Sequence, residues 1–368
     1  MKVKFNKTAF QEALTLAASV VPNRTPKPIL QCLRITSETD SVRICATDLE
    51  VGISYRITQV EVEREGDIVV PAEKIASIVR ESVDEVIELE STEATVHIRG
   101  ADSHFTIYGH EAEQYPAVPG FDVETDFEMD LAGLQRGIEQ TVFAAAKEST
   151  RYALNGILWE VKGKKLTLVA TDGRRLAKSI VGLVSSASNK VMKERPIVPS
   201  KAMLLLDKVG ADEGAKVAVH FMENQIILAC EQVVISSNLV EGNFPKYEDI
   251  IPSDNEKKIV LSTNATISAV RRAALLTDEE SKGIKLALSS KGTLVFSSRA
   301  PETGDAQVDM KVDYSGEPLE VGFNPQFLIE ALRVIKTEDL EFNLGDSDRP
   351  GMIKGGSDFL YIVMPVNL

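Results

Sequence analysis

Ala170-Thr171-Asp172-Gly173-Arg174-Arg175-Leu176 is the stretch around which the sequence is organised. Its Asp-Gly pair lies between an alternating apolar run that ends at Ala170 and a second apolar run that begins at Leu176, a pattern typical of a tight β-hairpin turn. Asp and Gly both tolerate the positive φ that such a turn requires. A weaker copy, Ala46-Thr47-Asp48-Leu49, follows a similar run and places Asp48 124 positions before Asp172. The sequence therefore predicts two related hairpins.

The order of the expected elements repeats three times along the chain. Pro71 and Pro199, like Leu166 and Leu294, lie 128 positions apart in equivalent places. Apolar residues at helical spacing predict two helices in each repeat, followed or separated by short strands. The expected helices span 6–21, 72–82, 130–147, 200–209, 264–276 and 325–336. The expected domains are 1–122, 123–253 and 254–368, with proline-marked loops between them. We therefore predict an α+β protein made of three domains, each with two helices and an antiparallel sheet.

Composition and length fit a globular protein of several domains. The 368 residues include 43% hydrophobic and 26% charged residues. No apolar run approaches the ~18 residues of a membrane span, and the N-terminus lacks the apolar core of a signal peptide, so we expect a cytoplasmic protein. Cys32, Cys45 and Cys230 form no Cys-x-x-Cys pair and are expected to be buried free thiols.

The charge of the chain is unevenly distributed. The net charge of −14 argues at first against a nucleic-acid partner. However, the six expected helices together carry +4, so the remaining residues carry −18. Acidic loops and strand edges could simply maintain solubility. Alternatively, the helices share one face toward a polyanion while the acidic exterior repels non-specific contacts.

No catalytic or metal-binding motif is present. The chain lacks phosphate-binding glycine loops, a Gly-x-Ser-x-Gly elbow and a His-Glu-x-x-His pair. His97, His104 and His110 match no metal-ligand spacing, and we expect them on strand surfaces. We therefore expect no enzyme activity, no metal and no cofactor. With 55 acidic residues, a hydrolase built on a pair of carboxylates remains open at this point, although nothing marks such a pair.

The triple repeat, the central turn, the Phe244-Pro245-Lys246-Tyr247 block and the ending Tyr361–Leu368 together resemble the bacterial β sliding clamps, the processivity subunits of DNA polymerase III. The resemblance covers essentially the whole chain. It implies a DNA clamp fold and a head-to-tail homodimer whose six domains close into a ring. Helices would line a central hole that holds duplex DNA without sequence specificity. Because such a ring encircles DNA instead of gripping it, weak water-mediated contacts suffice, and an acidic protein can serve in DNA replication.

The resemblance also implies contact residues for DNA and for the second subunit. The positions that match DNA-contacting residues of the family are Arg24, Arg151, Tyr152 and, with less support, Lys201. At the subunit contact, Lys74, Ile78, Phe105 and Ile107 of the first domain would face Leu275, Leu276, Glu302 and Asp305 of the third. Asp102 and His104 replace residues that are commonly basic, so apolar contacts would carry more of the stability of this dimer.

A pocket between the second and third domains binds partners in this family. It receives short peptides of glutamine and hydrophobic residues from the DNA polymerase III α subunit, the clamp loader, other polymerases and repair proteins. The matching positions are Leu154, Thr171, Gly173, Arg174, Arg175, Leu176, Pro245, Ile250, Phe327, Val363, Met364, Pro365, Val366 and Leu368. An apolar site with two guanidinium groups suits such peptides.

Several residues depart from the family pattern. Asp249, Ser281, Asp348 and Pro350 differ from the residues expected on the rim of the pocket, which leaves the choice of peptide open. The main alternative from another class is a repeat-built protein-interaction scaffold that never contacts DNA, and an open assembly would favour it.

Overall fold

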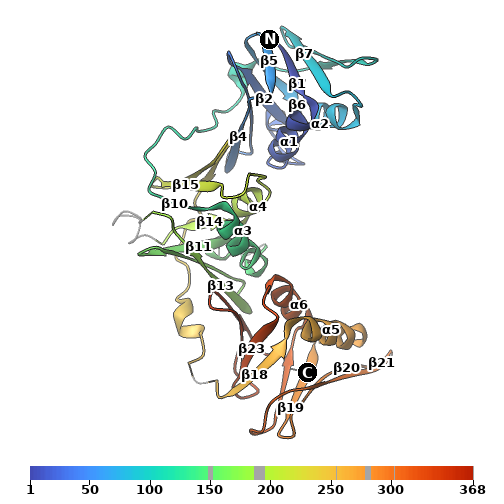
Figure 1. Ribbon diagram of the computed structural model, residues 1–368, viewed down its shortest axis with the longest axis vertical. Helices are drawn as coiled ribbons and strands as arrows, with labels where there is room; N and C mark the ends of the chain where they lie inside the picture. The colour runs from blue at the N-terminus through green and yellow to red at the C-terminus, as the bar shows by residue number, and fades with distance from the viewer. Residues whose placement is uncertain (148–151, 186–194, 254, 278–282, 302, 368) are drawn as a thin grey trace. The chain divides into compact units, whose positions relative to one another are not determined.

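The computed structural model describes residues 1–147, 152–185, 195–253, 255–277, 283–301 and 303–367 (Figure 1). The described residues form two compact units. The first unit draws on 1–135, 183–192 and 201–239, and the second on 136–182, 193–200 and 240–368. The second sequence repeat therefore contributes to both units. No helix among the described residues is long and apolar enough to span a membrane.

The first unit contains two sheets. One has the order β5-β1-β7-β8-β9 and the other β10-β15-β16-β17-β4-β3-β2-β6. The strands of the first sheet are β1 (Lys2–Asn6), β5 (Val60–Arg64), β7 (Val86–Thr92), β8 (Thr95–Arg99) and β9 (His104–Tyr108). Those of the second are β2 (Cys32–Ser37), β3 (Val42–Thr47), β4 (Val51–Ile57), β6 (Gly66–Pro71), β10 (Phe127–Asp130), β15 (Lys216–Phe221), β16 (Gln225–Cys230) and β17 (Val233–Asn238). Its helices are α1 (Lys7–Ala18), α2 (Ala72–Glu81) and most of α4 (Ser200–Leu206).

The second unit also contains two sheets, with the orders β14-β11-β12-β13-β25-β24-β23-β18 and β21-β20-β19-β22. The first consists of β11 (Gly156–Lys162), β12 (Lys165–Thr171), β13 (Arg175–Gly182), β14 (Ile197–Pro199), β18 (Lys257–Ser262), β23 (Asp339–Leu344), β24 (Gly351–Gly355) and β25 (Phe359–Val363). The other consists of β19 (Ile284–Ser289), β20 (Thr293–Ala300), β21 (Gly304–Lys311) and β22 (Leu319–Phe323). Its helices are α5 (Thr263–Ala273) and α6 (Pro325–Val334), while α3 (Leu131–Glu139) begins in the range of the first unit.

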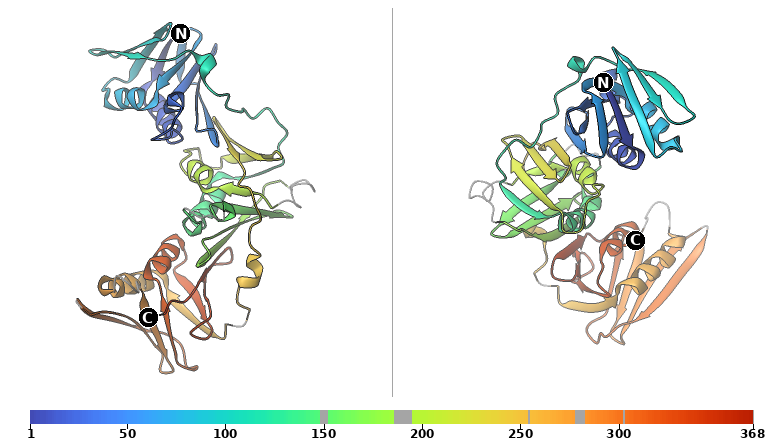
Figure 2. Two further views of the ribbon diagram at one scale, coloured as in Figure 1. Left: turned by 180° about the vertical axis from the view of Figure 1, so that it is seen from behind. Right: turned by 45° about the horizontal axis from the view of Figure 1, so that its top comes forward.

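The strand pairs in both units are antiparallel, as the sequence predicts. Within each unit, helices pack in pairs, α1 against α2 and α5 against α6 (Figure 2). The three cysteines are buried and free, as predicted.

All six predicted helices end before the expected residue, and the difference is largest for the helix expected at 130–147. The expected helix 130–147 stops at Glu139, where the Thr141 hydroxyl donates to the Gly137 carbonyl (2.7 Å) and a short 3-10 turn, η3 (Val142–Ala144), follows. A side chain that bonds back onto the helix and two consecutive β-branched residues both weaken helical continuation. The expected helix 200–209 stops at Leu206, and the Gln135 amide nitrogen donates to carbonyl oxygens at and beyond its end, including that of Leu206 (3.3 Å). These bonds satisfy carbonyls that a longer helix would use internally.

The hairpin predicted at Asp172-Gly173 is present between β12 and β13, but its turn is wider than the expected tight one. Thr171 pairs with Leu176, and only Gly173 has a positive φ, of 86°. Asp172 contributes its carboxylate, whose Oδ1 accepts the backbone N–H groups of Arg174 (2.9 Å) and Arg175 (3.1 Å). The Thr171 hydroxyl accepts from Gly173 N–H and donates to the Arg175 carbonyl. Side-chain bonds of this kind replace those of a two-residue turn.

The upstream copy between β3 and β4 has the same turn. Asp48 Oδ1 accepts the N–H groups of Glu50 (2.9 Å) and Val51 (2.7 Å), and the Thr47 hydroxyl bridges Leu49 N–H and the Val51 carbonyl. Leu49 takes the place of Gly173 and adopts a φ of 80°. The two copies recognised in the sequence therefore form turns with the same set of hydrogen bonds.

Each eight-stranded sheet joins two repeats through one strand pair. In the first junction, β4 pairs with β17 from Val51 opposite Ser237 to Tyr55 opposite Val233. In the second junction, β13 pairs with β25 from Arg175 opposite Val363 to Ser179 opposite Phe359. Val51 and Arg175 are equivalent residues after the two turns, so the junctions share one register. The second junction lies within a single unit and positions the candidate site.

Candidate peptide-binding site

Arg175 connects the central turn to α6 across the second junction. Only 8% of its side chain is exposed. Its Nε bonds Asp172 Oδ2 (3.0 Å), its Nη1 pairs with Glu330 of α6, and its Nη2 donates to the Phe143 carbonyl (2.7 Å). The guanidinium carbon also lies 4.4 Å from the centre of the Phe327 ring, a cation–π contact. One buried cation therefore fixes the relative positions of the turn, η3 and α6.

The charges around Arg175 are stable near neutral pH. Burial opposes ionisation of Glu330, but hydrogen bonds from Arg175 and Gln326 outweigh it and hold the pKa of Glu330 below its ordinary value. Burial likewise acts against the charge of Arg175, and the bond to Glu330 reverses this and raises the pKa of Arg175. The pair is therefore ionised.

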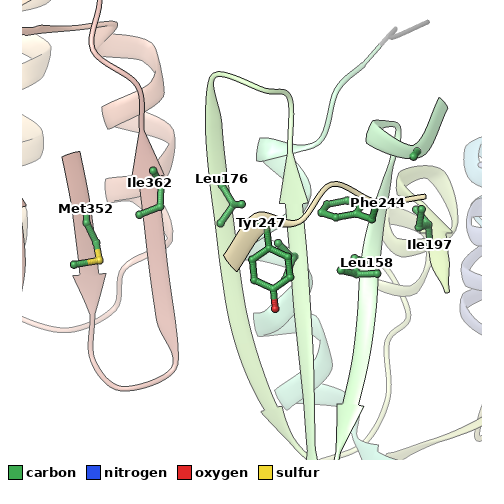
Figure 3. Packing of buried hydrophobic residues seen from close by; sticks show 9 residues of the cluster. Leu158, Leu176, Ile197, Phe244, Tyr247, Met352 and Ile362 are labelled. Atoms are coloured by element: carbon green, nitrogen blue, oxygen red, sulfur yellow. The ribbon is translucent and has the colours of Figure 1, made fainter. Parts of the chain in front are cut away.

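An apolar cluster lies beside this turn, with residues from both repeats (Figure 3). Leu176 comes from β13, and Met352 and Ile362 come from β24 and β25. Phe244 and Tyr247 come from the segment that connects the two repeats. The other members are Ala153, Leu158, Val169 and Ile197. The junction therefore has an apolar base on which hydrophobic side chains can pack.

The connecting segment is held in place by Tyr247. Its hydroxyl donates to Glu160 of β11, and Arg195 Nε bonds the other oxygen of Glu160 at 2.8 Å. The Arg195 guanidinium and the Lys178 ammonium both lie over the Tyr247 ring. Burial and the neighbouring Glu160 raise the pKa of Tyr247, so its hydroxyl keeps its proton and remains a donor. The segment with Phe244 therefore forms a fixed wall.

The residues after β25 run past the turn. Met364 N–H donates to the Arg174 carbonyl and Val366 N–H to the Gly322 carbonyl, both at 2.9 Å. Met364 is 37% exposed. This tail forms a second edge of the site and leaves an apolar side chain partly open to solvent.

A cavity of about 640 Å³ opens next to Arg175. It is lined by Ala145, Ala146, Lys147, Asp172, Arg174, Arg175 and Phe327. Its walls combine apolar surface with cations, which is a suitable arrangement for a short peptide with both apolar and polar groups.

The structure brings most of the expected peptide-contacting residues together around the second junction. Leu154, Thr171, Leu176 and Val363 are buried within it, Pro245, Pro365 and Val366 are partly buried, and Ile250 is 40% exposed. Gly173 and Arg174 are exposed at the turn. Leu368 lies outside the described residues. Of the departures from the family pattern, Asp249 and Asp348 are exposed, the Pro350 carbonyl accepts from Asn255, and Ser281 lies outside the described residues.

Several residues of the site were not among those expected. Phe143, Glu330, Glu160 and Arg195 have no motif of their own. Glu330 follows Phe327 by three positions on α6 and so shares its face, which was the one available signal. Phe244 and Tyr247 belong to the block that supported the family resemblance, but they were not among the residues expected to contact a peptide.

The residues expected to contact DNA have different surroundings. Arg24 is exposed, Tyr152 is 71% exposed in η4 (Tyr152–Leu154), and Arg151 lies outside the described residues. Lys201, by contrast, pairs with Asp48 and donates to the Val20 carbonyl (3.1 Å). Burial opposes ionisation of Asp48, but the bonds from Lys201, Val51 and Glu50 outweigh it and lower the pKa of Asp48. The charge of Lys201 therefore serves the first junction.

The residues expected at the subunit contact lie at or near two sheet edges. Phe105 and Ile107 are on β9 and Asp305 is on β21, each the last strand of its sheet. Lys74 and Ile78 are on α2, and Leu275 and Leu276 form η7 (Ala274–Leu276), where Leu275 is 78% exposed. Glu302 lies outside the described residues. Exposed apolar residues beside an unpaired edge are features of an interface.

The histidines lie on the surface, as predicted. His97 is partly buried on β8 and His104 is exposed on β9, with Nδ1 of His97 and Nε2 of His104 3.2 Å apart, and His110 is exposed as well. Within the described part of the chain, no group of three or more His, Cys, Asp or Glu residues could hold a metal ion.

Comparisons with known proteins agree over the whole length. Models of the DNA polymerase III beta subunit match the chain at residues 1–119 (N-terminal domain), 128–246 (central domain) and 248–367 (C-terminal domain). The beta sliding clamp of Pseudomonas aeruginosa is 32% identical over 371 residues, covering 100% of both chains. That of Chlamydia pneumoniae is 29% identical, covering 100% of this chain and 99% of the other.

Solved structures are similar to the same extent. The crystal structure of the DNA polymerase sliding clamp from Pseudomonas aeruginosa matches with a TM-score of 0.91 and 31% identity, covering 100% of both chains. That from Bacillus subtilis matches with a TM-score of 0.93 and 26% identity, covering 100% of this chain and 99% of the other.

Proposed function

The chain belongs to the DNA polymerase III beta subunit family, and from this premise we propose that it encircles duplex DNA as a head-to-tail homodimer and tethers its partners there. As a member of this family it is a non-catalytic processivity factor, a sliding clamp. We propose domain boundaries near residues 122 and 253. The clamp would act in the cytoplasm, where bacterial DNA is replicated.

The observation that carries the dimer proposal is the pair of equivalent junctions within one chain. β4 and β13 each follow the turn of their repeat and pair with the last strand of the next repeat, β17 or β25. β21 follows the corresponding turn of the third repeat, and β9 is the last strand of the first. Both are edge strands among the described residues. Pairing of β21 with the β9 of a second copy would make a third junction of the same kind, and two such contacts would close a ring of six domains.

DNA would be retained by topology and by few direct contacts. Arg24, Arg151 and Tyr152 remain the proposed contacts. Lys201 is a weaker candidate, because its ammonium is already paired with Asp48. Few phosphate contacts mean weak direct affinity and a shallow salt dependence, which suits movement along the duplex.

The second junction would bind the peptides of partner proteins. We propose as partners the DNA polymerase III α subunit, the clamp loader, and other polymerases and repair proteins that carry a short hydrophobic motif. Their apolar residues would pack on the cluster around Leu176, Phe244 and Ile362, beside the tail at Met364. Deletion of residues 364–368 should abolish binding of a polymerase-derived peptide and leave the dimer intact.

Small-angle scattering with an absolute mass tests the assembly. We expect about twice 40.2 kDa and the profile of a hollow ring. Phe105→Asp, which places a charge on the β9 edge, should give a folded monomer, while Tyr152→Asp serves as a control far from that edge in the sequence. A monomer of the unmodified chain that persists at high concentration would overturn the ring.

Retention on DNA tests the function separately. The loaded clamp should remain on a circular plasmid and leave the same plasmid after it is cut once. Arg24→Ala with Arg151→Ala should weaken loading or retention on the circle, and no change would remove those residues from the proposal.

A further inference from the structure

We propose that the subunit contact of this chain contains a binding site for a divalent transition metal ion such as Zn²⁺, formed by His97 and His104 of one copy and Asp305 of the other. The inference rests on the proposed function, because it requires the pairing of β9 with the β21 of a second copy. The metal would stabilise the contact that closes the ring.

Two of the four histidines of the chain meet on the sheet that ends at β9. Nδ1 of His97 on β8 lies 3.2 Å from Nε2 of His104 on β9, and the two rings are tilted by 40° to each other. Imidazole nitrogen is a preferred ligand of zinc, copper and nickel. Two nitrogens that bind one tetrahedral zinc ion at about 2.05 Å lie about 3.3 Å apart. The pair therefore already has the spacing that a shared metal requires.

A metal would replace the hydrogen bond that joins the two rings. Only one of the two facing nitrogens of His97 and His104 needs to carry a hydrogen for this bond, and a metal takes the place of that hydrogen. The Thr106 hydroxyl also lies 3.2 Å from His97 Nδ1. Because a hydroxyl group rotates, Thr106 can turn its hydrogen away and accept one from a water molecule on the metal.

The basic groups on this face of the sheet are already paired. Arg99 follows His97 on β8, and its guanidinium bonds Glu88 (2.9 Å) and Glu90 (2.8 Å). On β1, two strands away from β8, Lys2 and Lys4 pair with glutamates of β5. Since carboxylates neutralise these cations, the face does not strongly repel a divalent metal ion.

One chain supplies only part of a coordination shell. Within the residues that the structure describes, no group of three or more His, Cys, Asp or Glu could hold a metal ion. Two imidazoles alone form a weak site, because stable zinc sites have three or four protein ligands. The sequence predicted no metal for the same reason, since the spacing of residues in one chain does not show what a second copy adds. A further ligand would come from the second copy.

The β21 edge carries carboxylates on its exposed face. Asp305, Gln307 and Asp309 are exposed, and the residues between them, Ala306 and Val308, are partly or fully buried. Alternation along β9 places its histidine on one face of the strand and its apolar residues on the other. If β9 and β21 pair with their apolar residues on the same face, the carboxylates of one copy lie on the same face as the histidines of the other.

The two junctions within the chain indicate the register of this contact. In both, the first residue of β4 or β13 lies opposite one of the last two residues of its partner strand. The same rule places Gly304 of β21 opposite one of the last two residues of β9, and only Ile107 keeps the apolar residues on one face. Asp305 then lies opposite Thr106 and diagonal to His104, within reach of the metal. A two-fold symmetric dimer contains two such sites.

The dissociation of the dimer with and without zinc tests the proposal. Full-length labelled protein is diluted in EDTA or in buffered free zinc, and sedimentation velocity gives the Kd of the dimer. Because the dimer has two sites, free zinc at about twice the Kd of one site should tighten the dimer about tenfold. Magnesium at the same concentration should have no effect, since it prefers oxygen ligands.

Variants assign the ligands. His97→Gln and His104→Gln should each abolish the effect of zinc, and Asp305→Asn should remove most of it. His110→Gln, at an exposed histidine outside the pair, is the matched control and should respond to zinc as the unmodified protein does. The ratio of the Kd in EDTA to the Kd in zinc is compared within each variant, so a change in the dimer itself does not affect the result.

A monomeric variant tests the contribution of the second copy. Phe105→Asp is expected to be a folded monomer and retains both histidines. In calorimetric titration, the unmodified dimer should bind one zinc ion per chain, and the Phe105→Asp monomer should bind zinc about tenfold more weakly. Equal affinities would overturn the role of Asp305 from the second copy.

The outcomes separate this inference from the proposed function. A dimer with the same Kd in EDTA and in zinc would overturn the metal site and leave the ring intact. A zinc effect that persists when His97→Gln is combined with His104→Gln would overturn the assignment of the ligands, as would zinc that produces larger aggregates instead of dimers. A chain that stays monomeric with and without zinc would contradict both proposals.

Discussion

The first and second junctions of this molecule share one backbone arrangement but differ in the side chains around the turn. Both have a Thr-Asp turn, five pairs of opposed residues at equivalent positions and a stabilising cation. At the first junction, Tyr115 covers the turn: its hydroxyl donates to the Cys32 carbonyl (3.0 Å) and accepts Thr47 N–H (3.2 Å). Phe244 lies 129 positions after Tyr115 and has no hydroxyl. The turn of the first junction is therefore bound by this hydroxyl, whereas a cavity lies beside the turn of the second junction.

The comparison shows that the two junctions share one backbone arrangement and differ in a few side chains. Lys201 reaches Asp48 from α4 and is 43% exposed, whereas Arg175 reaches Asp172 and Glu330 from within the turn and is 8% exposed. The same bridging role is thus carried out by a surface ammonium in one junction and a buried guanidinium in the other.

Removal of the cations Arg175 and Lys201 should give the largest difference in stability between the two junctions. Arg175→Ala leaves Asp172, Glu330 and the Phe143 carbonyl without their partner, and we expect a loss of about 3 kcal/mol in the free energy of unfolding. Lys201→Ala removes an exposed charge and should cost about 0.5 kcal/mol. Urea unfolding of both variants measures the difference, and equal losses would contradict the comparison.

The hydroxyl of Tyr115 should stabilise the turn of the first junction. Tyr115→Phe leaves Thr47 N–H and the Cys32 carbonyl unpaired in a buried place, so we expect a loss of about 1.5 kcal/mol. Hydrogen exchange of the Thr47 amide should become faster. Tyr152→Phe, at an exposed position, is the matched control and should change neither quantity.

Acid should weaken the second junction before the first. The folded pKa of Glu330 is lowered, so its contribution to stability is full above its ordinary pKa of 4.5 and is lost as pH falls through the folded value. The contribution of Asp48 begins to fall only below 3.8. We expect Glu330→Gln to flatten the dependence of unfolding free energy on pH between about 5 and 3. An unchanged slope would mean that this carboxylate has the same pKa in both states.

The smallest effect concerns the left-handed residue of each turn. Gly173→Ala should cost about 1 kcal/mol, because φ at this position is positive although there is space for a methyl group. Leu49→Gly at the equivalent position relieves the same strain and should gain about 0.5 kcal/mol. Thermal unfolding at matched pH compares them, and changes of the same sign would show that the two turns are not equivalent.

The sequence contained enough to predict the repeat, the fold class and the hairpins, because each depends on local spacing and turn chemistry. Thr-Asp at the same place in two repeats predicted turns that prove to share four hydrogen bonds. The end of α3 was missed because it depends on the Thr141 hydroxyl, which bonds back to the Gly137 carbonyl. Gly137 itself lies close to β13, since a Cβ added at this position would be 2.7 Å from Val181.

The ion pairs of the junctions could not be predicted from the sequence for a different reason. Lys201 and Asp48 are 153 positions apart, and Arg175 and Glu330 are 155 apart. With 41 basic and 55 acidic residues, nothing local indicates which of them meet. For the same reason, the sequence did not indicate that Lys201 pairs with Asp48.

Each junction joins the two halves of an eight-stranded sheet through a single strand pair, and this has a mechanical consequence. Force applied perpendicular to the paired strands breaks their hydrogen bonds one after another, whereas force along the strands must break all of them together. In the proposed dimer, the energy needed to open the assembly would then depend mainly on one strand edge and its few side-chain contacts.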